Sequence, residues 1–446
     1  LTLGGSGTAV TLACGATQAG FGRTGTVNWD TTKITADPGP AVSGRGYFTD
    51  TSGSAFNVTL PSSPSAGDII AVADYANNWG NNAVTILRNG SNIEGSASDF
   101  ICNQTGASIT FVFVDATKGW ITVNSGNSSQ AFGETFISAS GGTITECGND
   151  KIHTFTGPGT FTVTTAANSA PNNIVSYLVV AGGGGGGNKR AGGGGAGGYR
   201  ELKNPINPFT ASPLDGFPSA PNRITVTATG FPITVGAGGV GGTASGSTCN
   251  IGTASTDGSN SIFSTITSAG GGTGGGISPN AGPNGSGKPG GSGGGGFAGG
   301  TPIAPFPAST AAGTGNDPST TPAQGNPGGI SRTSPAPSGQ AAGGGGATEA
   351  GKAGNDPGGN DGKGGAGATS EINGSPVARA GGGGGGSRGP GVAAPGGTGG
   401  GGNGVPTGNG TSGTVNTGGG GGGMSDCNCA SSGAGGSGVV IIRYKF

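Results

Sequence analysis

One stretch of the sequence resembles a site that binds phosphate groups. Residues 282–289 read Gly-Pro-Asn-Gly-Ser-Gly-Lys-Pro. In a phosphate-binding loop, backbone N–H groups surround the phosphates, and the hydroxyl that follows the lysine holds Mg²⁺. Pro289 occupies the position of that hydroxyl, and no apolar strand leads directly into the loop. The pattern therefore does not predict a nucleotide site.

A second stretch matches the turn that carries a nucleophilic serine. Residues 290–294 read Gly-Gly-Ser-Gly-Gly, which places Ser292 where a hydrolase would have its nucleophile. Such a serine needs a neighbouring base, and His153 is the single histidine of the chain. His153 stands beside Phe155 in a β-prone segment, where an ordinary strand position is the simpler interpretation. Hydrolase chemistry is not predicted.

Metal and carboxylate chemistry have equally little support. Cys427 and Cys429 could bind a soft metal, but a zinc site needs four ligands, and the other four cysteines are far apart in the sequence. The alternatives for this pair are small turn residues or a disulfide between subunits. Acidic residues are sparse and no pair stands out for glycoside hydrolysis, so a polysaccharide depolymerase remains only an alternative. We predict a protein that is not an enzyme and has no cofactor.

The composition narrows the class of protein. The 446 residues include 110 Gly and 28 Pro, while only 9% are charged and the net charge is −1. Gly and Pro at this level usually indicate disorder, but disordered chains combine low hydrophobicity with high net charge. The basic residues form no stripe, which argues against nucleic-acid binding. No apolar run is long enough for a membrane span, so we expect a protein that is not embedded in a membrane.

Glycine usage divides the chain. Residues 1–150 hold 22 of the 110 glycines, so a domain boundary near residue 150 is expected. Residues 1–45 are interpreted as an irregular lead-in that attaches the chain. Residues 46–150 are predicted to form an all-β domain, and residues 151–446 a glycine-rich domain.

The predicted N-terminal domain shows strand patterns at regular spacing. Apolar and polar residues alternate over 56–60, the period of a half-buried strand. Further β-prone runs follow at 69–75, 83–87, 109–114 and 120–123, separated by turn residues. No stretch has helical periodicity with capping residues. We expect a β-meander or sandwich with almost no α-helix.

Short apolar runs mark the ends of the glycine-rich domain. Residues 177–181 and 438–446 are continuous apolar runs, typical of strands buried on both faces. We expect strands within 152–181, beginning with a hairpin at 152–165, to close the domain against 438–446. Between them, a β-prone segment followed by a glycine run recurs at 174–187, 261–272 and 372–386, and more weakly at 414–423.

The glycine runs indicate an unusual interior. An extended chain with three residues per turn has no internal hydrogen bonds, so its N–H and C=O groups must bond to neighbours or water. Without side chains, such segments can lie close together and bond laterally. The sequence lacks the strict period of collagen, so we predict a bundle of polyglycine II helices. Flexible glycine loops on a small β core are the alternative.

Loops at the ends of a rigid bundle can carry binding residues. Two long segments rich in Pro, Ser, Thr and Ala, 202–222 and 301–340, are candidates for exposed loops. The candidate receptor contacts are Phe209, Phe217, Phe306 and Tyr199. The alternative is that these segments are connectors without a binding role.

Two regions resemble proteins of tailed phages. Residues 47–68, with Gly119-Trp-Ile121, resemble a β domain that recurs in tail fibres, especially of marine phages. Tyr177-Leu-Val-Val-Ala-Gly-Gly and the terminal Gly435-Gly-Ser-Gly-Val-Val-Ile-Ile-Arg-Tyr444 resemble the glycine-rich domain of many phage tail and fibre proteins. The tip adhesins of T-even-like phages are similar in principle, with packed polyglycine helices that present variable loops.

The resemblance implies a function. It implies a virion structural protein, a homotrimeric tail fibre or receptor-binding adhesin assembled in a reducing host cytoplasm and exposed on the particle surface. Its expected partners are other tail or capsid proteins and a host-surface polysaccharide or outer-membrane protein. The alternatives are a capsid-surface fibre or decoration protein and, on composition alone, an extracellular filament subunit.

Overall fold

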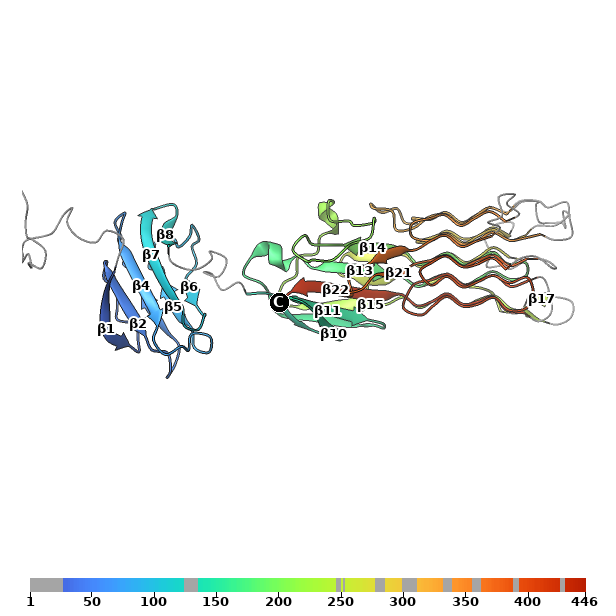
Figure 1. Cartoon of the computed structure of the whole chain (residues 1–446). Coiled ribbons are helices and arrows are strands. Elements are labelled where there is room, and N and C mark those ends of the chain that lie inside the picture. The colour runs from blue at the N-terminus through green and yellow to red at the C-terminus, as the bar shows by residue number, and fades with distance from the viewer. Residues whose placement is uncertain are drawn as a thin grey trace, which may run out of the picture. The chain divides into compact units, whose positions relative to one another are not determined.

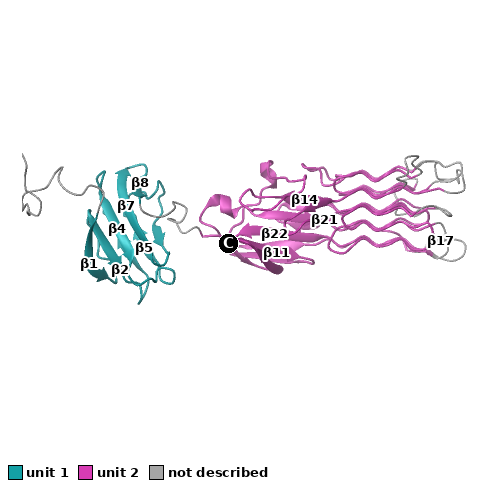
Figure 2. Cartoon of the chain, viewed as in Figure 1, with its two compact units in different colours: residues 1–134 teal, residues 135–446 magenta. Residues whose placement is uncertain are grey.

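The described part of the chain is almost entirely β-structure and extended chain (Figure 1). The structure is a computed structural model. It describes residues 27–123, 135–245, 250–251, 253–276, 285–298, 311–331, 339–354, 362–387, 393–425 and 430–446. Within these ranges the helices are two short 3₁₀ turns, η1 (Ala170–Asn173) and η2 (Ala220–Asn222). The chain divides into two compact units, residues 1–134 and 135–446 (Figure 2).

The first unit is a β-sandwich. One sheet has the order β1-β2-β4-β7-β8 and the other β3-β5-β6, with the apolar core formed from both sheets. Trp79 and Trp120 are fully buried in this core. The strands are β1 (Asn28–Ile34), β2 (Arg45–Thr49), β3 (Phe56–Thr59), β4 (Ile69–Asp74), β5 (Val84–Leu87), β6 (Phe100–Cys102), β7 (Ser108–Asp115) and β8 (Gly119–Thr122). The strands predicted from 56 to 123 are confirmed.

Two details of this unit differ from the sequence-based expectation. The lead-in over residues 1–45 was expected to be irregular, but β1 pairs in parallel with β2 and belongs to the sheet. β2 also pairs in parallel with β4, and β3 with β5. Because parallel neighbours require crossover connections, the domain is a sandwich and not a meander. Residues 1–26 lie outside the described ranges.

The second unit begins with a second β-sandwich, built from two five-stranded sheets of order β10-β11-β22-β13-β14 and β19-β18-β15-β12-β9. Its strands are β9 (Ser138–Ser140), β10 (Thr143–Cys147), β11 (Asp150–Phe155), β12 (Gly159–Thr165), β13 (Ser176–Val180), β14 (Tyr199–Leu202), β15 (Gly230–Thr234), β18 (Ser261–Phe263), β19 (Ile266–Ser268) and β22 (Val439–Lys445). Short two-stranded pieces are β16 (Ala244–Ser245) with β17 (Asn250–Ile251), and β20 (Ala368–Ser370) with β21 (Val377–Arg379).

The compact unit begins before the boundary that was predicted near residue 150, and its first hairpin was predicted wrongly. β10 pairs with β11 and β9 pairs with β12, so the unit begins at residue 135 and not at 151. The expected hairpin over 152–165 does not form, because β11 and β12 belong to different sheets. The Gly-Pro-Gly sequence at 157–159 instead turns the chain from one sheet to the other.

The closing pair of strands is confirmed. β13 and β22 are antiparallel neighbours, with Tyr177 opposite Ile442. Both strands are buried on both faces, as their continuous apolar sequences predicted. Val179 and Val440 point into the sandwich core, whereas Leu178 joins a separate apolar cluster on the other face of the sheet.

Beyond the sheets, the glycine runs form a bundle of polyglycine II helices. The wavy segments of Figure 1 run side by side from the strands to the end of the unit marked by β17. Hydrogen bonds repeat every third residue, which is the period of this helix. Gly184 N–H donates to Gly195 O at 2.8 Å, and Gly187 N–H donates to Gly192 O, in the same neighbour, at 3.1 Å.

The helix formed by residues 182–187 is bonded on all sides. Its successive N–H groups turn to three neighbours in rotation, and its carbonyl groups accept from three others. The accepting neighbours are residues 256–259, 433–436 and 192–195, and the donating neighbours are 271–274, 239–242 and the segment at Gly421. Six neighbours around one helix correspond to hexagonal packing. The alternative of flexible glycine loops is therefore wrong for the described runs.

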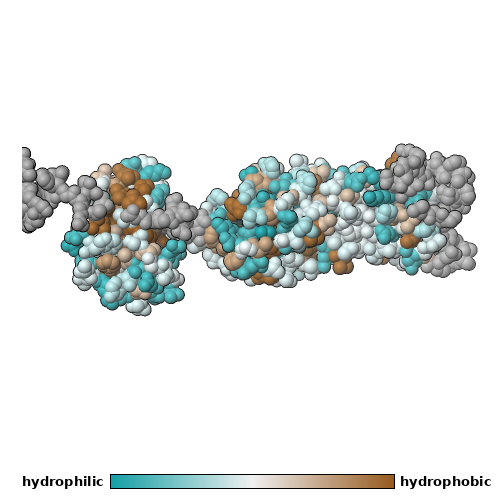
Figure 3. Space-filling view, in the orientation of Figure 1, coloured by the Kyte–Doolittle hydropathy of each residue, from teal (hydrophilic) through white to brown (hydrophobic). Residues whose placement is uncertain are grey.

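This packing leaves no room for side chains. A Cβ atom added to Gly184 would lie 2.2 Å from the carbonyl oxygen of Gly272. The glycine runs that follow residues 180, 269 and 380 are all part of this lattice. The weaker fourth copy of the pattern, at 414–423, differs because residues 415–418 form a turn and not a strand. Figure 3 shows one face of the unit, where the surface over the bundle is mostly pale, near the middle of the hydropathy scale.

We expect Gly184→Ala to destabilise the second unit by about 1–3 kcal/mol or more, because the added methyl group meets a backbone carbonyl that the surrounding helices hold in place. Thermal unfolding of the whole chain measures the effect. Gly157→Ala is the matched control, since nothing lies within 4 Å of its added Cβ. Equal unfolding temperatures for the two variants would contradict the close-packed lattice.

Candidate functional site

The structure places the residues that the sequence marked for chemistry inside the fold. Ser292 is fully buried in the bundle, and His153 is fully buried in the sandwich core. The N–H of Lys288 donates to Thr273 O at 3.0 Å, so this part of the apparent phosphate loop is used in the lattice. Residues 282–284, Cys427 and Cys429 lie outside the described ranges.

The candidate contact residues have different environments. Tyr199, on β14, and Phe209 are buried, so the prediction that they are exposed receptor contacts is wrong for both. Their rings pack in the apolar cluster on the outer face of the β13–β22 sheet. Phe217 is half-buried against the sandwich core, with the Arg223 guanidinium 4.4 Å from its ring centre. Phe306 lies outside the described residues.

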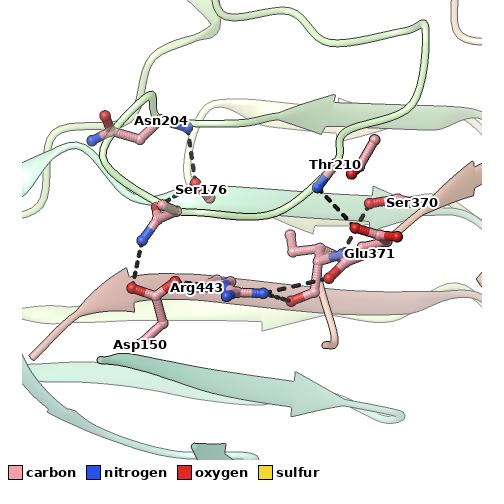
Figure 4. A network of polar contacts seen from close by, with 9 residues as sticks. Asp150, Ser176, Asn204, Thr210, Ser370, Glu371 and Arg443 are labelled. Atoms are coloured by element: carbon pink, nitrogen blue, oxygen red, sulfur yellow. Dashed lines mark hydrogen bonds and ion pairs between the residues drawn. The ribbon is translucent and has the colours of Figure 1, made fainter. Parts of the chain in front are cut away.

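Tyr199 and Phe209 border a buried polar network. Figure 4 shows the part of this network around Asp150 and Arg443. At its centre, Arg443 on β22 donates from Nε to Asp150 Oδ2 on β11, at 2.7 Å. The two side chains are 1% and 2% exposed. A buried charge pair is stable only when further hydrogen bonds satisfy its remaining donors and acceptors.

Those further bonds on the Asp150 side come from the loop after β14. Asn207 Nδ2 donates to Asp150 Oδ1 at 3.0 Å, and Asn207 Oδ1 accepts from the Ser176 hydroxyl at 2.7 Å. The same hydroxyl oxygen accepts the backbone N–H of Asn204 at 2.8 Å. The loop is therefore attached to both β11 and β13.

On the Arg443 side, the network reaches the connection between β20 and β21. Arg443 Nη1 lies 3.4 Å from the carbonyl oxygen of Glu371 and 3.3 Å from that of Ile372. The Glu371 carboxylate in turn accepts the N–H of Thr210 at 3.1 Å. The Arg443 guanidinium also lies over the Phe209 ring, 4.9 Å from its centre. One arginine thus connects the closing strand, the long loop and the β20–β21 hairpin.

A second buried acid belongs to the same region. Glu201, on β14, accepts from the Tyr199 hydroxyl at 2.9 Å, from the N–H of Ser212 at 3.0 Å and from the hydroxyl of Ser370. Burial, and then the negative charge of Glu201, raise the pKa of Tyr199 well above its usual value. Tyr199 therefore stays protonated and acts as a hydrogen-bond donor.

The space beside this network is small. A cavity of about 10 Å³ has room for roughly one water molecule. It is lined by Tyr177, Tyr199, Arg200, Glu201, Leu214, Asn222 and Pro322. Among the described residues, no three His, Cys, Asp or Glu side chains gather in a group that could hold a metal ion. This arrangement can lock the loop, the hairpin and the sheet together.

Sequence reasoning missed the network, although one signal was present. Arg443 is a charged residue within an apolar run that predicts a fully buried strand, and a buried charge needs a partner. Its partner Asp150 is 293 residues away, so only the pairing of β11 with β22 reveals it.

The fold and this site define an all-β protein whose second unit is a laterally bonded polyglycine bundle joined to a β-sandwich. A family model for the glycine-rich domain matches residues 154–445, so the chain belongs to the glycine-rich domain family. Comparison with curated proteins returns no match. No helix in the described ranges is long and apolar enough to cross a membrane.

We expect Arg443→Met to cost about 3–5 kcal/mol of unfolding free energy, because it leaves the Asp150 carboxylate buried without its ion-pair partner. The double variant Arg443→Met/Asp150→Asn removes both charges and should recover part of this loss. Denaturant unfolding of the four proteins of the cycle measures the coupling. A double variant that loses the full sum of the single effects would show that the two residues act independently.

We expect His153 to make the stability of the sandwich pH-dependent. Nδ1 lies 2.7 Å from Gly141 O and therefore donates, while Nε2 lies 3.0 Å from the Tyr444 hydroxyl and accepts. Burial raises the pKa of Tyr444 to about 12, which keeps this donor protonated. Burial, and secondarily the charge of Lys151, lower the pKa of His153, although its bond to Gly141 opposes the shift.

The unfolded chain therefore binds a proton at this histidine more readily than the folded chain does. Its contribution to stability is complete above the unfolded pKa of about 6.5 and decreases as the pH falls below it. We expect the unfolding temperature to fall between about pH 7 and about pH 5, and His153→Gln to remove part of this slope. An identical slope in the variant would contradict the assignment.

Proposed function

We propose that the chain is a virion structural protein of a tailed phage, a tail fibre or receptor-binding adhesin that recognises the host surface. The observation that carries this proposal is the bundle itself. A lattice bonded through its own backbone keeps its shape whatever residues connect its helices. Connections on a rigid scaffold can change sequence without a cost in folding, and they commonly carry binding residues.

The end of the bundle away from the sheets supports this role. Around a turn at residues 188–190, Arg190 donates its N–H to Ser425 O at 3.3 Å and accepts the N–H of Ala298 at 3.0 Å. Gln340 and Ser387 are paired at a further bridge of the bundle. Residues 299–310, 388–392 and 426–429, which directly follow Ala298, Ser387 and Ser425, lie outside the described ranges. The proposal assigns receptor contact to the connections between the helices of the bundle, and Phe306 remains the sequence-based candidate for this contact.

The rest of the proposal follows the resemblance to phage fibres. The protein is a homotrimer on the particle surface, the first unit attaches it to other virion proteins, and the ligand is a host polysaccharide or outer-membrane protein. Membership of the glycine-rich domain family supports the scaffold part of this proposal. The sandwich lies at the other end of the second unit, and the Arg443–Asp150 network holds its loops in place. This supports receptor contact at the end of the bundle away from the sandwich.

The test is binding of the fluorescently labelled whole chain to intact bacterial cells, with competition against adsorption of the phage that carries it. We expect saturable binding and, in excess, blocked adsorption. Phe306→Ser should weaken binding by about tenfold or more, as loss of an aromatic interface contact commonly does. Ile144→Ser, at an exposed apolar residue on β10 of the sandwich, is the control.

Three outcomes would overturn the proposal. A chain that binds no host cell and copurifies with tail-less heads is a capsid decoration protein. A chain that self-assembles without limit is a filament subunit. Clearing of host polysaccharide by the purified chain would show enzymatic activity.

A further inference from the structure

The outer helices of the bundle present side chains in a regular pattern. In the segment 236–243, Ala237 and Val240 are exposed, whereas Gly236, Gly239 and Gly242 are buried. A helix with three residues per turn returns to the same side every third residue. An outer helix can therefore carry side chains on one row while glycine faces its neighbours. Exposed residues also recur at every third position in segments 393–398 and 410–414, whereas 430–437 is only partly exposed.

Five outer segments lie next to one another along one side of the bundle: 236–243, 430–437, 410–414, 400–405 and 393–398. Backbone hydrogen bonds connect each segment to the next. These are Gly435 N–H to Gly239 O at 2.8 Å, Gly413 N–H to Ala434 O at 2.8 Å, Thr414 N–H to Gly400 O at 2.8 Å and Gly404 N–H to Ala394 O at 2.9 Å. We call these segments, with the adjoining Val415, the uncharged side.

The name reflects its composition. None of the five segments contains Asp, Glu, Lys or Arg, and the row residues are Ala, Val, Ser, Thr, Pro and Asn. Other outer segments of the bundle carry Asp257, Lys288, Glu349, Lys352 and Lys363. There, Lys288 pairs with Asp257 at 3.5 Å and Lys352 with Glu349 at 2.5 Å. Among the outer segments that the structure describes, these charges are therefore on one part of the circumference.

The uncharged side also exposes apolar side chains. Val240 is 51% exposed and Val415 is 68% exposed. Ile330, 50% exposed, belongs to a segment outside this side, and its carbonyl accepts the N–H of Gly354. The cores of protein interfaces are depleted of charged residues, because burying an unpaired charge is costly. A surface of this composition can lose its water at little electrostatic cost.

We propose that the uncharged side packs against a second copy of this chain, so that bundles associate side by side. Two such sides meet without like-charge repulsion, whereas a partner that presents charges would leave them buried and unpaired. The rows on both copies have the same spacing, since both are set by three residues per turn. This inference rests on the proposed function, which includes a homotrimer, and it assigns a surface to that self-association. Its test measures association alone and not host binding.

The test compares variants of the whole chain by sedimentation velocity and light scattering over a range of concentrations. We expect the unaltered chain to associate, and Val240→Glu/Val415→Glu to weaken association by about tenfold or more, because like charges then face each other. Thr398→Glu, on a different segment of the same side, should act in the same direction. Ile330→Glu is the matched control and should leave association unchanged.

All three variants alter exposed positions, and equal unfolding temperatures would confirm that each one folds. The proposal is overturned if the unaltered chain is monomeric throughout, if Ile330→Glu weakens association as much as the others do, or if the glutamates on the uncharged side change nothing.

Discussion

Lateral hydrogen bonding between backbones without side chains is the constraint on which the second unit depends. Each residue of a polyglycine helix presents one N–H and one C=O, and a turn of three residues directs them to six neighbours. Buried amides must be paired, so each inner helix is held only while its neighbours are in place. The glycine content follows directly, because a Cβ atom on an inner helix would overlap a carbonyl group.

The sandwich and the bundle have different interiors, one apolar and one of backbone, but the same chain segments run through both. The β13 strand continues directly into the helix at 182–187, and the segment at 433–436 continues into β22. Val180 and Val439 are opposite each other in the sheet, and Gly183 N–H still bonds to Gly436 O in the bundle. The apolar strands thus set the register in which the first glycine helices meet. Arg443 and Asp150 then attach the loop and the hairpin to the same sheet.

This architecture also limits where function can be located. The interior of the bundle is backbone, and the buried Arg443–Asp150 network of the sandwich lies near a cavity for about one water. Both proposals therefore assign contacts to the surface of the bundle and to the connections between its helices. A rigid body with a side-chain-free interior suits display and association, which is the physical basis of the two proposals.

The sequence by itself determined the elements whose signal is local. Alternating residues predicted the strands of the first unit, continuous apolar runs predicted β13 and β22 as doubly buried strands, and glycine runs predicted laterally bonded helices. Candidate site residues were less predictable. An aromatic residue such as Tyr199 or Phe209 can pack in a core or form a binding contact, and local sequence does not show which of the two it does. In the structure both are buried. Tertiary structure alone decided the pairing of Asp150 with Arg443, the separation of β11 from β12 and the alignment of uncharged segments on one side. Each of these depends on which distant segments become neighbours, and in a lattice of nearly identical glycine helices local sequence carries little information about that choice.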